Sequence, residues 1–436
     1  MRNVLTAVMV CVAVAVVAAW DPGDPVTTYW FGPGYPKQAQ GLTETWAKQL
    51  KDGGFNTVWA SSPEELDVAA EFGLRAIYAI DPARGGRPKV DIDDPAQRAA
   101  LSARIERAKR HPALYVYGLY DEPSVEMYAE LARVKDFIRR LDPEHAAWVN
   151  LLPTYATNKM LGIDGNIIRA YVEHVRLFGE IYRPELISHD HYQFNNNGDT
   201  PNYFLNLGII RQSAAAQNIP FWNGVQACGW KWAGGRASPN SPRIPGVGEL
   251  RYCAWTTAAY GAHGIYYFVY CRGGHDGAIA ETDGRTGEKY EALKTINREF
   301  IAIAKALSPL DFKGAYFQGV HSPGTTPYCS QALLEISPGT PYSEVTPPKQ
   351  LLGTTLVSRF EAPDKPVHLV VVNCDHQNER ALHVKSPSAA ERFDPLKHTW
   401  SAVGTEFDLA LLRGGGALLR FVPEGMQTAA WKGKVK

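Results

Sequence analysis

Two patterns of hydrophobic positions alternate along residues 27–307 of the chain. Short runs in which almost every residue is apolar are typical of strands buried on both faces. Longer stretches with apolar residues three and four positions apart are typical of amphipathic helices. The predicted strands cover 27–32, 55–61, 74–81, 113–121, 146–152, 186–192, 220–226 and 264–270. The predicted helices cover 43–54, 63–73, 95–110, 126–141, 166–182, 203–217, 248–261 and 289–307.

Eight strands that alternate with eight helices predict an α/β chain folded as a closed parallel (β/α)8 barrel, the TIM barrel. A doubly wound open sheet is the main alternative, but no glycine-rich phosphate loop follows the first predicted strand. We expect the barrel to occupy residues 20–307.

The pattern changes after residue 307. Pro, Gly, Ser and Thr separate short runs in which apolar and polar residues alternate, over 314–320, 356–362, 367–375, 379–385 and 417–423. Such runs are typical of half-buried antiparallel strands. Residues 308–436 are therefore predicted to form a small C-terminal antiparallel β-sandwich.

Residues 1–19 have the pattern of an export signal. Arg2 precedes an apolar stretch over 4–17, and small residues end the segment at 17–19. A cleaved secretory signal has this arrangement, and the apolar stretch is short for a membrane span. We expect a secreted or periplasmic protein with no membrane span after signal cleavage.

Composition narrows the classes of partner. The 45 basic and 45 acidic residues cancel, which argues against nucleic acid and against a polybasic membrane patch. Five cysteines follow the signal, without a C-x-x-C or Cys/His zinc spacing, so we expect at most one disulfide, no metal and no cofactor. The eleven Trp residues exceed what the core needs, and aromatic side chains often line binding clefts.

Candidate chemistry gathers at the ends of the predicted strands, where the active site of a (β/α)8 barrel forms. The fourth strand ends in the adjacent carboxylates Asp121 and Glu122. Partial burial and a like-charged neighbour both raise the pKa of a carboxyl group, as a general acid requires. Asp121 could instead cap the following helix, but such a cap does not require Glu122.

Four segments at these strand ends carry a resemblance to a known family. They are GLYDEPS (118–124), WVNLLPTYA (148–156), SHDHYQF (188–194) and AYGAHGIYYFVY (259–270). Together they resemble secreted bacterial (β/α)8 glycoside hydrolases of the clan whose fourth strand usually ends in Asn-Glu-Pro. The resemblance implies a carbohydrate substrate and a general acid/base role for Glu122. Two positions depart from it: Asp121 replaces the Asn, and Gln226 stands where the clan has its nucleophilic Glu.

Three hypotheses accommodate these departures. Asp190 could be the second carboxylate of the reaction. Alternatively, Asp121 could orient the acetamido group of a substrate that attacks its own glycosidic carbon, as in β-N-acetylhexosaminidases. The third hypothesis is a barrel that binds glycans without cleaving them. Since neighbours on a strand face opposite sides, Asp190 is a weaker candidate if His189 and His191 face inward.

The remaining candidates would bind substrate, with flat rings against the apolar face of a sugar and polar groups at its hydroxyls. The predicted substrate-binding residues are Trp30, Tyr78, Asn150, His189, His191, Tyr192, Trp222, Asn223, Gln226 and Tyr267.

Overall fold

The computed structural model describes residues 20–36, 41–81, 90–231, 238–344 and 351–421. The predicted export signal lies outside the described residues. Within them, no helix combines the length and the apolar character needed to cross a membrane.

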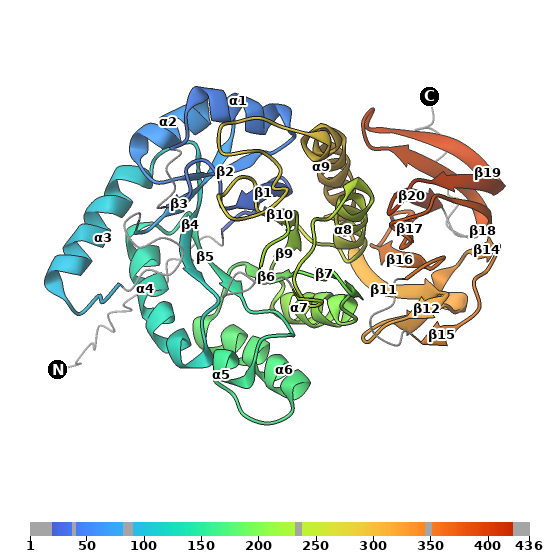
Figure 1. The fold of residues 1–436 in the computed structure, drawn as a ribbon, viewed down its shortest axis with the longest axis horizontal. Helices are drawn as coiled ribbons and strands as arrows, with labels where there is room; N and C mark the ends of the chain where they lie inside the picture. Colours follow the sequence, from blue (N-terminus) through green and yellow to red (C-terminus); the bar gives the residue numbers. More distant parts are fainter. Residues whose placement is uncertain (1–19, 37–40, 82–89, 232–237, 345–350, 422–436) are drawn as a thin grey trace, which may run out of the picture.

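Eight parallel strands form the barrel (Figure 1). They are β1 (Val26–Trp30), β2 (Thr57–Ala60), β3 (Arg75–Ala79), β4 (Leu114–Asp121), β5 (Ala146–Leu151), β6 (Ile187–His191), β9 (Phe221–Gln226) and β10 (Gly264–Phe268). Hydrogen-bonded pairing runs in the order β1-β10-β9-β6-β5-β4-β3-β2. The ring is nearly closed: between β1 and β2, the Trp59 indole donates to the carbonyl oxygen of Tyr29 at 2.8 Å. The predicted barrel is confirmed.

Helices surround the ring in the predicted order. They are α1 (Glu44–Asp52), α2 (Pro63–Glu71), α3 (Pro95–Ala108), α4 (Tyr128–Leu141), α6 (Ile167–Leu177), α7 (Tyr203–Gln217), α8 (Val247–Ala259) and α9 (Glu288–Leu307). Three short helical turns accompany them: η1 (Val125–Met127), α5 (Asn158–Leu161) and η2 (Phe178–Tyr182). Only α5 lies outside the predicted helices, because η2 falls within the predicted 166–182 and η1 overlaps the start of the predicted 126–141. The boundaries follow local signals. Ser62 accepts a hydrogen bond from the backbone of Glu65 at the start of α2, for example, and Pro63 follows it.

Aromatic side chains fill the barrel below its mouth, where branched aliphatic residues are commoner. The indoles of Trp30, Trp59, Trp148 and Trp222 form a chain of ring contacts, with centroids 5.1–5.6 Å apart. Glycines on the strands make room for these rings. A Cβ at Gly118 would lie 2.7 Å from Trp59, and one at Gly264 would lie 2.5 Å from Trp222. Large and small residues are therefore matched across the interior.

The C-terminal strands form a curled, mostly antiparallel sheet in the order β13-β11-β16-β17-β20-β18-β14, with β19 paired to β18. Its strands are β11 (Asp311–Gln318), β13 (Thr326–Pro327), β14 (Glu335–Ser337), β16 (Thr355–Glu361), β17 (Val367–Asn373), β18 (Arg380–Asp394), β19 (Thr399–Leu411) and β20 (Gly416–Phe421). Two strand pairs lie apart from it: β7 (Phe194–Asn195) with β8 (Gly198–Asp199), and β12 (Val320–His321) with β15 (Ser343–Glu344).

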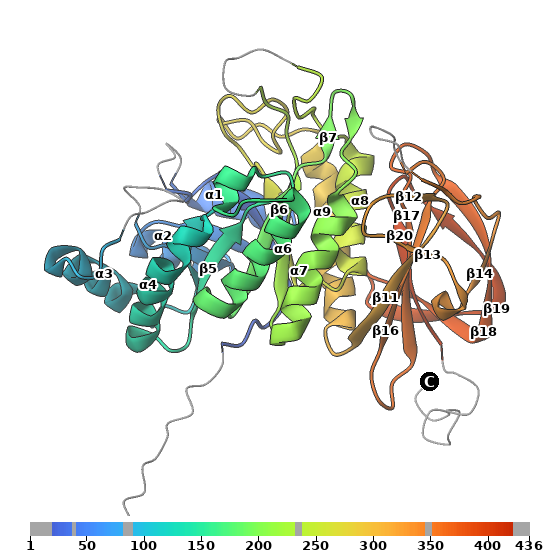
Figure 2. The same cartoon turned by 90° about the horizontal axis from the view of Figure 1, so that it is seen from below.

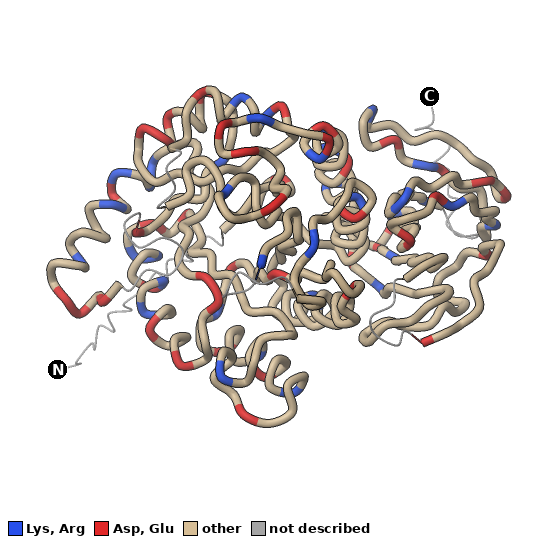
Figure 3. Tube along the Cα trace, viewed as in Figure 1, with Lys and Arg blue, Asp and Glu red and all other residues tan. Residues whose placement is uncertain are grey.

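The curled sheet packs against the α7, α8 and α9 side of the barrel (Figures 1 and 2). Aromatic contacts join the two parts: Tyr260 stacks on Phe312, and Phe204 meets the edge of Phe317. Acidic and basic residues are interspersed along both parts (Figure 3). The five cysteines that fall within the described residues are free thiols.

Candidate active site at the carboxyl ends of the barrel strands

A buried amide draws two of the predicted carboxylates together. Asp121 is the last residue of β4, and Asp190 lies on β6. The side-chain nitrogen of Asn150, on β5 between these strands, donates to Asp121 Oδ1 at 3.2 Å and to Asp190 Oδ2 at 3.1 Å. The strand order thus brings together residues that are 69 positions apart in the sequence (121 and 190).

Asn150 has no hydrogen-bonding capacity left for a substrate. Its Oδ1 accepts from Ser188 Oγ at 3.1 Å and from the Tyr266 hydroxyl at 2.7 Å. Two donors and two acceptor positions are all an amide offers, and Asn150 is 1% exposed. It therefore positions the carboxylates, in place of the predicted substrate contact. The sequence analysis did not single out Ser188 and Tyr266 as its partners.

Glu122 follows β4 directly, in an unusual backbone conformation. Its φ is +53°, in the left-handed region that residues other than glycine seldom adopt. Its backbone N–H donates to the carbonyl oxygen of Asn150 at 2.8 Å. Asp121 does not occupy the cap of a following helix, since Ser124 and Met127 are the N-cap residues of η1 and α4.

Asp190 is the most deeply buried of the three carboxyl groups, at 4% exposed. Its Oδ2 accepts from Asn150 and, at 2.9 Å, from the Tyr192 hydroxyl. Its Oδ1 is buried without a hydrogen-bond partner among the described residues. Burial first, and then the negative charges of Glu122 and Asp121, raise the pKa of Asp190 well above its usual value. The carboxyl group therefore favours its protonated form.

The two histidines beside Asp190 face away from the site. Ser188 and Asp190 point into the barrel, so the alternation along β6 turns His189 and His191 toward the helices. The ring of His191 lies 3.1 Å from Asn206 Oδ1, on α7. His189 is fully buried, and burial lowers its pKa to about 3. Both histidines were predicted to contact substrate, but neither side chain faces the mouth of the barrel. Because they face outward, Asp190 faces inward and remains a candidate for the second carboxylate.

Three more predicted contacts also lie on the outer face of the barrel. Tyr78 carries the Arg104 guanidinium over its ring at 4.1 Å. The other two bond to helices: the Tyr267 hydroxyl to Asn297 Oδ1 at 2.9 Å, and the Asn223 amide to Thr257 Oγ1 at 2.8 Å. These side chains join strands to helices. The sequence predicted which strand each residue belongs to, but the prediction did not take into account whether the side chain faces the interior or the helices.

The remaining predicted contacts lie in the interior or under a loop. Trp30 and Trp222 belong to the indole layer below the mouth, at 4% and 0% exposed. The amide of Gln226 accepts from the backbone N–H of Phe194 at 2.9 Å and donates to the carbonyl oxygen of Arg243 at 2.7 Å. Gln226 therefore links the segment at Phe194 to the segment at Arg243.

An aromatic rim borders the carboxyl groups. The half-buried ring of Tyr192, a predicted substrate contact, lies 4.8 Å from that of Phe268 and 5.3 Å from that of Trp230. Phe268 also contacts Phe31 at 5.7 Å. Tyr155 is 42% exposed, and its hydroxyl accepts from the backbone N–H of Tyr192 at 3.1 Å. Tyr155 and Trp230, like Tyr192, follow predicted strand ends and were aromatic candidates for sugar binding, whereas Phe31 and Phe268 were not predicted.

Comparisons with known proteins give similarity of fold alone. Neither a protein-family model nor a curated sequence matches the chain. A β-L-arabinopyranosidase of family GH27 from Geobacillus stearothermophilus is 10% identical, with 93% of this chain and 98% of that chain covered and a TM-score of 0.48. The cyclomaltodextrin glucanotransferase CldA is 11% identical, with coverage of 92% and 100% and a TM-score of 0.48.

A GH128 endo-β-1,3-glucanase from Amycolatopsis mediterranei is 15% identical, with coverage of 62% and 97% and a TM-score of 0.37. At these identities and scores, the likeness concerns the course of the chain and assigns no activity. The chain is thus similar in fold to enzymes that act on carbohydrates.

Proposed function

We propose that this chain is an exported glycoside hydrolase that cleaves O-glycosidic bonds of an oligosaccharide or polysaccharide. One observation carries the proposal: Asp121, Glu122 and Asp190 meet at the carboxyl ends of β4 and β6, beside the aromatic rim. Most glycoside hydrolases use two carboxyl groups at one site, one protonated and one ionised. The partly exposed rings next to them suit the apolar face of a sugar.

Asp190 and Glu122 divide the chemistry between them. Glu122, directly after the fourth strand, was expected to be the general acid/base. The raised pKa of Asp190 favours the reverse division, in which Asp190 donates its proton to the glycosidic oxygen as the C–O bond breaks. Glu122 then attacks the sugar carbon or removes a proton from an attacking water. The unpartnered Oδ1 of Asp190 is the oxygen available to hold this proton.

Asp121 supports a second mechanism. Asn150 fixes its carboxylate next to Glu122, where it could orient the acetamido group of an N-acetylated substrate. In that mechanism Glu122 is the proton donor, and Asp190 contributes only to the local field. The choice of substrate and leaving group separates the two mechanisms.

The test is hydrolysis of aryl glycosides, including N-acetylhexosaminides, that carry good and poor leaving groups. A good leaving group departs without a proton, so loss of the acid matters little for it. We expect Asp190→Asn to lower kcat/KM by about 10²- to 10⁴-fold on poor leaving groups and far less on good ones. Glu122→Gln should lose activity on both. Asp52→Asn, which alters an exposed carboxylate at the end of α1, is the matched control and should retain activity.

Other outcomes redirect the proposal. Equal losses for Glu122→Gln and Asp121→Asn, confined to N-acetylated substrates, would favour substrate assistance. If the wild type cleaves no glycoside, natural oligosaccharides included, and Glu122→Gln still binds glycan, the chain is a binding protein.

A further inference from the structure

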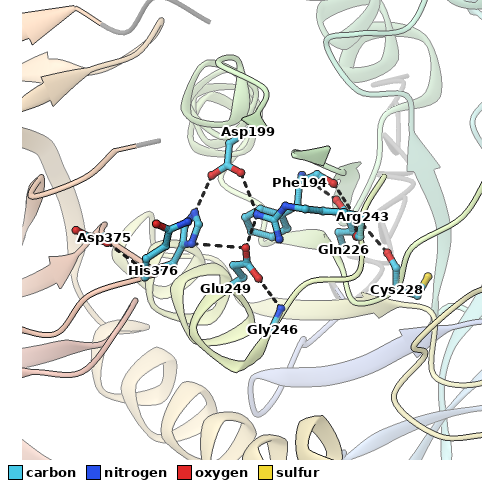
Figure 4. Close-up of polar contacts among 10 residues, drawn as sticks. Phe194, Asp199, Gln226, Cys228, Arg243, Gly246, Glu249, Asp375 and His376 are labelled. Carbon is cyan, nitrogen blue, oxygen red and sulfur yellow. Dashed lines mark hydrogen bonds and ion pairs between the residues drawn. The ribbon is translucent and has the colours of Figure 1, made fainter. Parts of the chain in front are cut away.

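A partly buried cluster of ionisable groups joins the barrel to the C-terminal sheet (Figure 4). We call Asp199, Arg243, Glu249 and His376 the junction cluster. His376 Nε2 lies 2.7 Å from Asp199 Oδ2, and its Nδ1 lies 3.6 Å from Glu249 Oε1. Arg243 bridges the same two carboxylates, at 3.3 Å from Asp199 and in direct contact with Glu249. His376 is the member that comes from the C-terminal part of the chain.

Hydrogen bonds within the C-terminal part of the chain hold the backbone around His376 in place. Asp375 Oδ1 accepts hydrogen bonds from the backbone N–H groups of Gln377 and Asn378, each at 3.0 Å. Asp375 Oδ2 accepts from the backbone N–H of Gly353 at 3.1 Å. A rigid turn after β17 therefore presents the imidazole.

The barrel holds a matching surface for this turn. The His376 ring meets Phe194 and Tyr252 at centroid distances of 5.6 and 5.7 Å. A Cβ at Gly248, in the first turn of α8, would lie 2.3 Å from the carbonyl oxygen of His376. The close approach requires glycine at this position and leaves the imidazole buried, at 6% exposed for the residue.

The junction cluster is connected to the proposed active site through the β7–β8 hairpin. Asp199 belongs to β8 and pairs with Phe194 of β7, and this hairpin starts two residues after Tyr192. Phe194 is fixed further by Gln226, and its carbonyl oxygen accepts from the backbone N–H of Arg243 at 2.9 Å. Tyr192 in turn donates its hydroxyl hydrogen to Asp190.

We propose that His376 is a positioning residue for the active site: it holds the β7–β8 hairpin and, through it, the Tyr192–Asp190 pair. The inference rests on the proposed function for its catalytic part. It gives the C-terminal sheet a role, since its turn completes the support of a loop at the barrel mouth. His376 itself touches no reacting group.

The test combines catalysis with amide hydrogen exchange in His376→Ala and His376→Gln. Loss of the imidazole should accelerate exchange in residues 193–200 at least tenfold. It should lower kcat on poor leaving groups about tenfold with little change in KM, because the aromatic rim remains. A glutamine side chain can direct an N–H toward Asp199, so His376→Gln should recover most of both effects.

His368→Ala is the matched control. His368 is a buried histidine of β17, and its Nδ1 lies 2.8 Å from the carbonyl oxygen of Pro366, within the C-terminal sheet. The His368→Ala substitution should lower the stability of that sheet without changing amide hydrogen exchange in residues 193–200. Unchanged exchange in His376→Ala, or equal acceleration in His368→Ala, overturns the inference. If the wild type shows no turnover, the proposed function is wrong. The hydrogen-exchange data then still decide whether His376 holds the β7–β8 hairpin.

Discussion

Asp190 shows how the surroundings of one residue change its chemistry. An exposed aspartate is ionised at neutral pH, but here burial and two neighbouring carboxylates favour the proton. Hydrogen bonds from Tyr192 and Asn150 oppose the shift, because they stabilise the ionised form. The effect of burial on the pKa is larger than the opposite effect of these two hydrogen bonds. The carboxyl group of Asp190 therefore binds its proton more tightly than that of an exposed aspartate.

This pKa shift predicts how stability depends on pH. A folded-state pKa above the unfolded value means that the folded chain binds the proton more tightly. The associated stability is present below about pH 4 and is lost as pH rises toward the folded-state pKa. Relative to Asp190→Asn, the wild type should lose up to about 1.4 kcal/mol of unfolding free energy per pH unit in that window.

Denaturant titrations of both proteins between pH 4 and pH 8 measure this difference. Asp52→Asn, at an exposed position on α1, should follow the wild type at every pH. A difference between wild type and Asp190→Asn that stays constant over this range would contradict a raised pKa.

At the scale of elements, the barrel depends on glycines opposite aromatic rings. Gly224, on β9, pairs in register with Tyr266 of β10. A Cβ there would lie 2.1 Å from the Tyr266 ring. The ring has little freedom to move, since its hydroxyl donates to Asn150 and so supports the carboxylates.

We therefore expect Gly224→Ala to destabilise the chain by about 1 to 3 kcal/mol, the usual cost of overpacking. It should also reduce activity, because a displaced Tyr266 no longer bonds to Asn150. Gly208→Ala is the matched control: Gly208 lies on α7, and apart from its chain neighbours and the backbone of its own helix no atom lies within 4 Å of the added Cβ. That change should stabilise the chain by about 1 kcal/mol. Thermal unfolding and kcat/KM of the two variants check this contrast.

At the scale of the whole molecule, the barrel and the curled sheet share apolar surface. Trp255 of α8 packs so closely on the C-terminal sheet that a Cβ at Gly416 would lie 2.5 Å from its ring. Phe204 and Tyr260 make further contacts across the junction. Buried side chains of this size contribute about 2 to 3 kcal/mol each. The two parts should therefore depend on each other for stability.

Calorimetry of a chain that comprises residues 20–436 should accordingly show one unfolding transition. A truncated chain that ends at residue 308 should expose Trp255, Phe204 and Tyr260, and should aggregate or melt well below the full chain. Two separate transitions, or a truncated barrel with the melting temperature of the full chain, would contradict this dependence.

Local patterns determined the order of the elements. The apolar runs and the caps lie within short stretches of sequence, so they located the barrel strands and helices within a few residues, as for α7 at Tyr203–Gln217. The sequence pattern predicted the long strands β18 and β19 less completely. Their exposed residues, as in β19 (Thr399–Leu411), weaken the apolar pattern, and pairing with neighbouring strands defines them.

The sequence by itself also determined that carboxylates end the fourth and sixth barrel strands. Only the tertiary structure decided which side chains meet. An irregularity in the pairing of β4 with β5, between Gly118 and Tyr120, interrupts strict alternation and lets Asp121 reach Asn150. The proton on Asp190 and the contact of His376 with Asp199 depend likewise on groups distant in sequence. Hydrophobic periodicity is a local property of the chain, whereas burial, charge proximity and side-chain facing arise only when the strands close into a barrel.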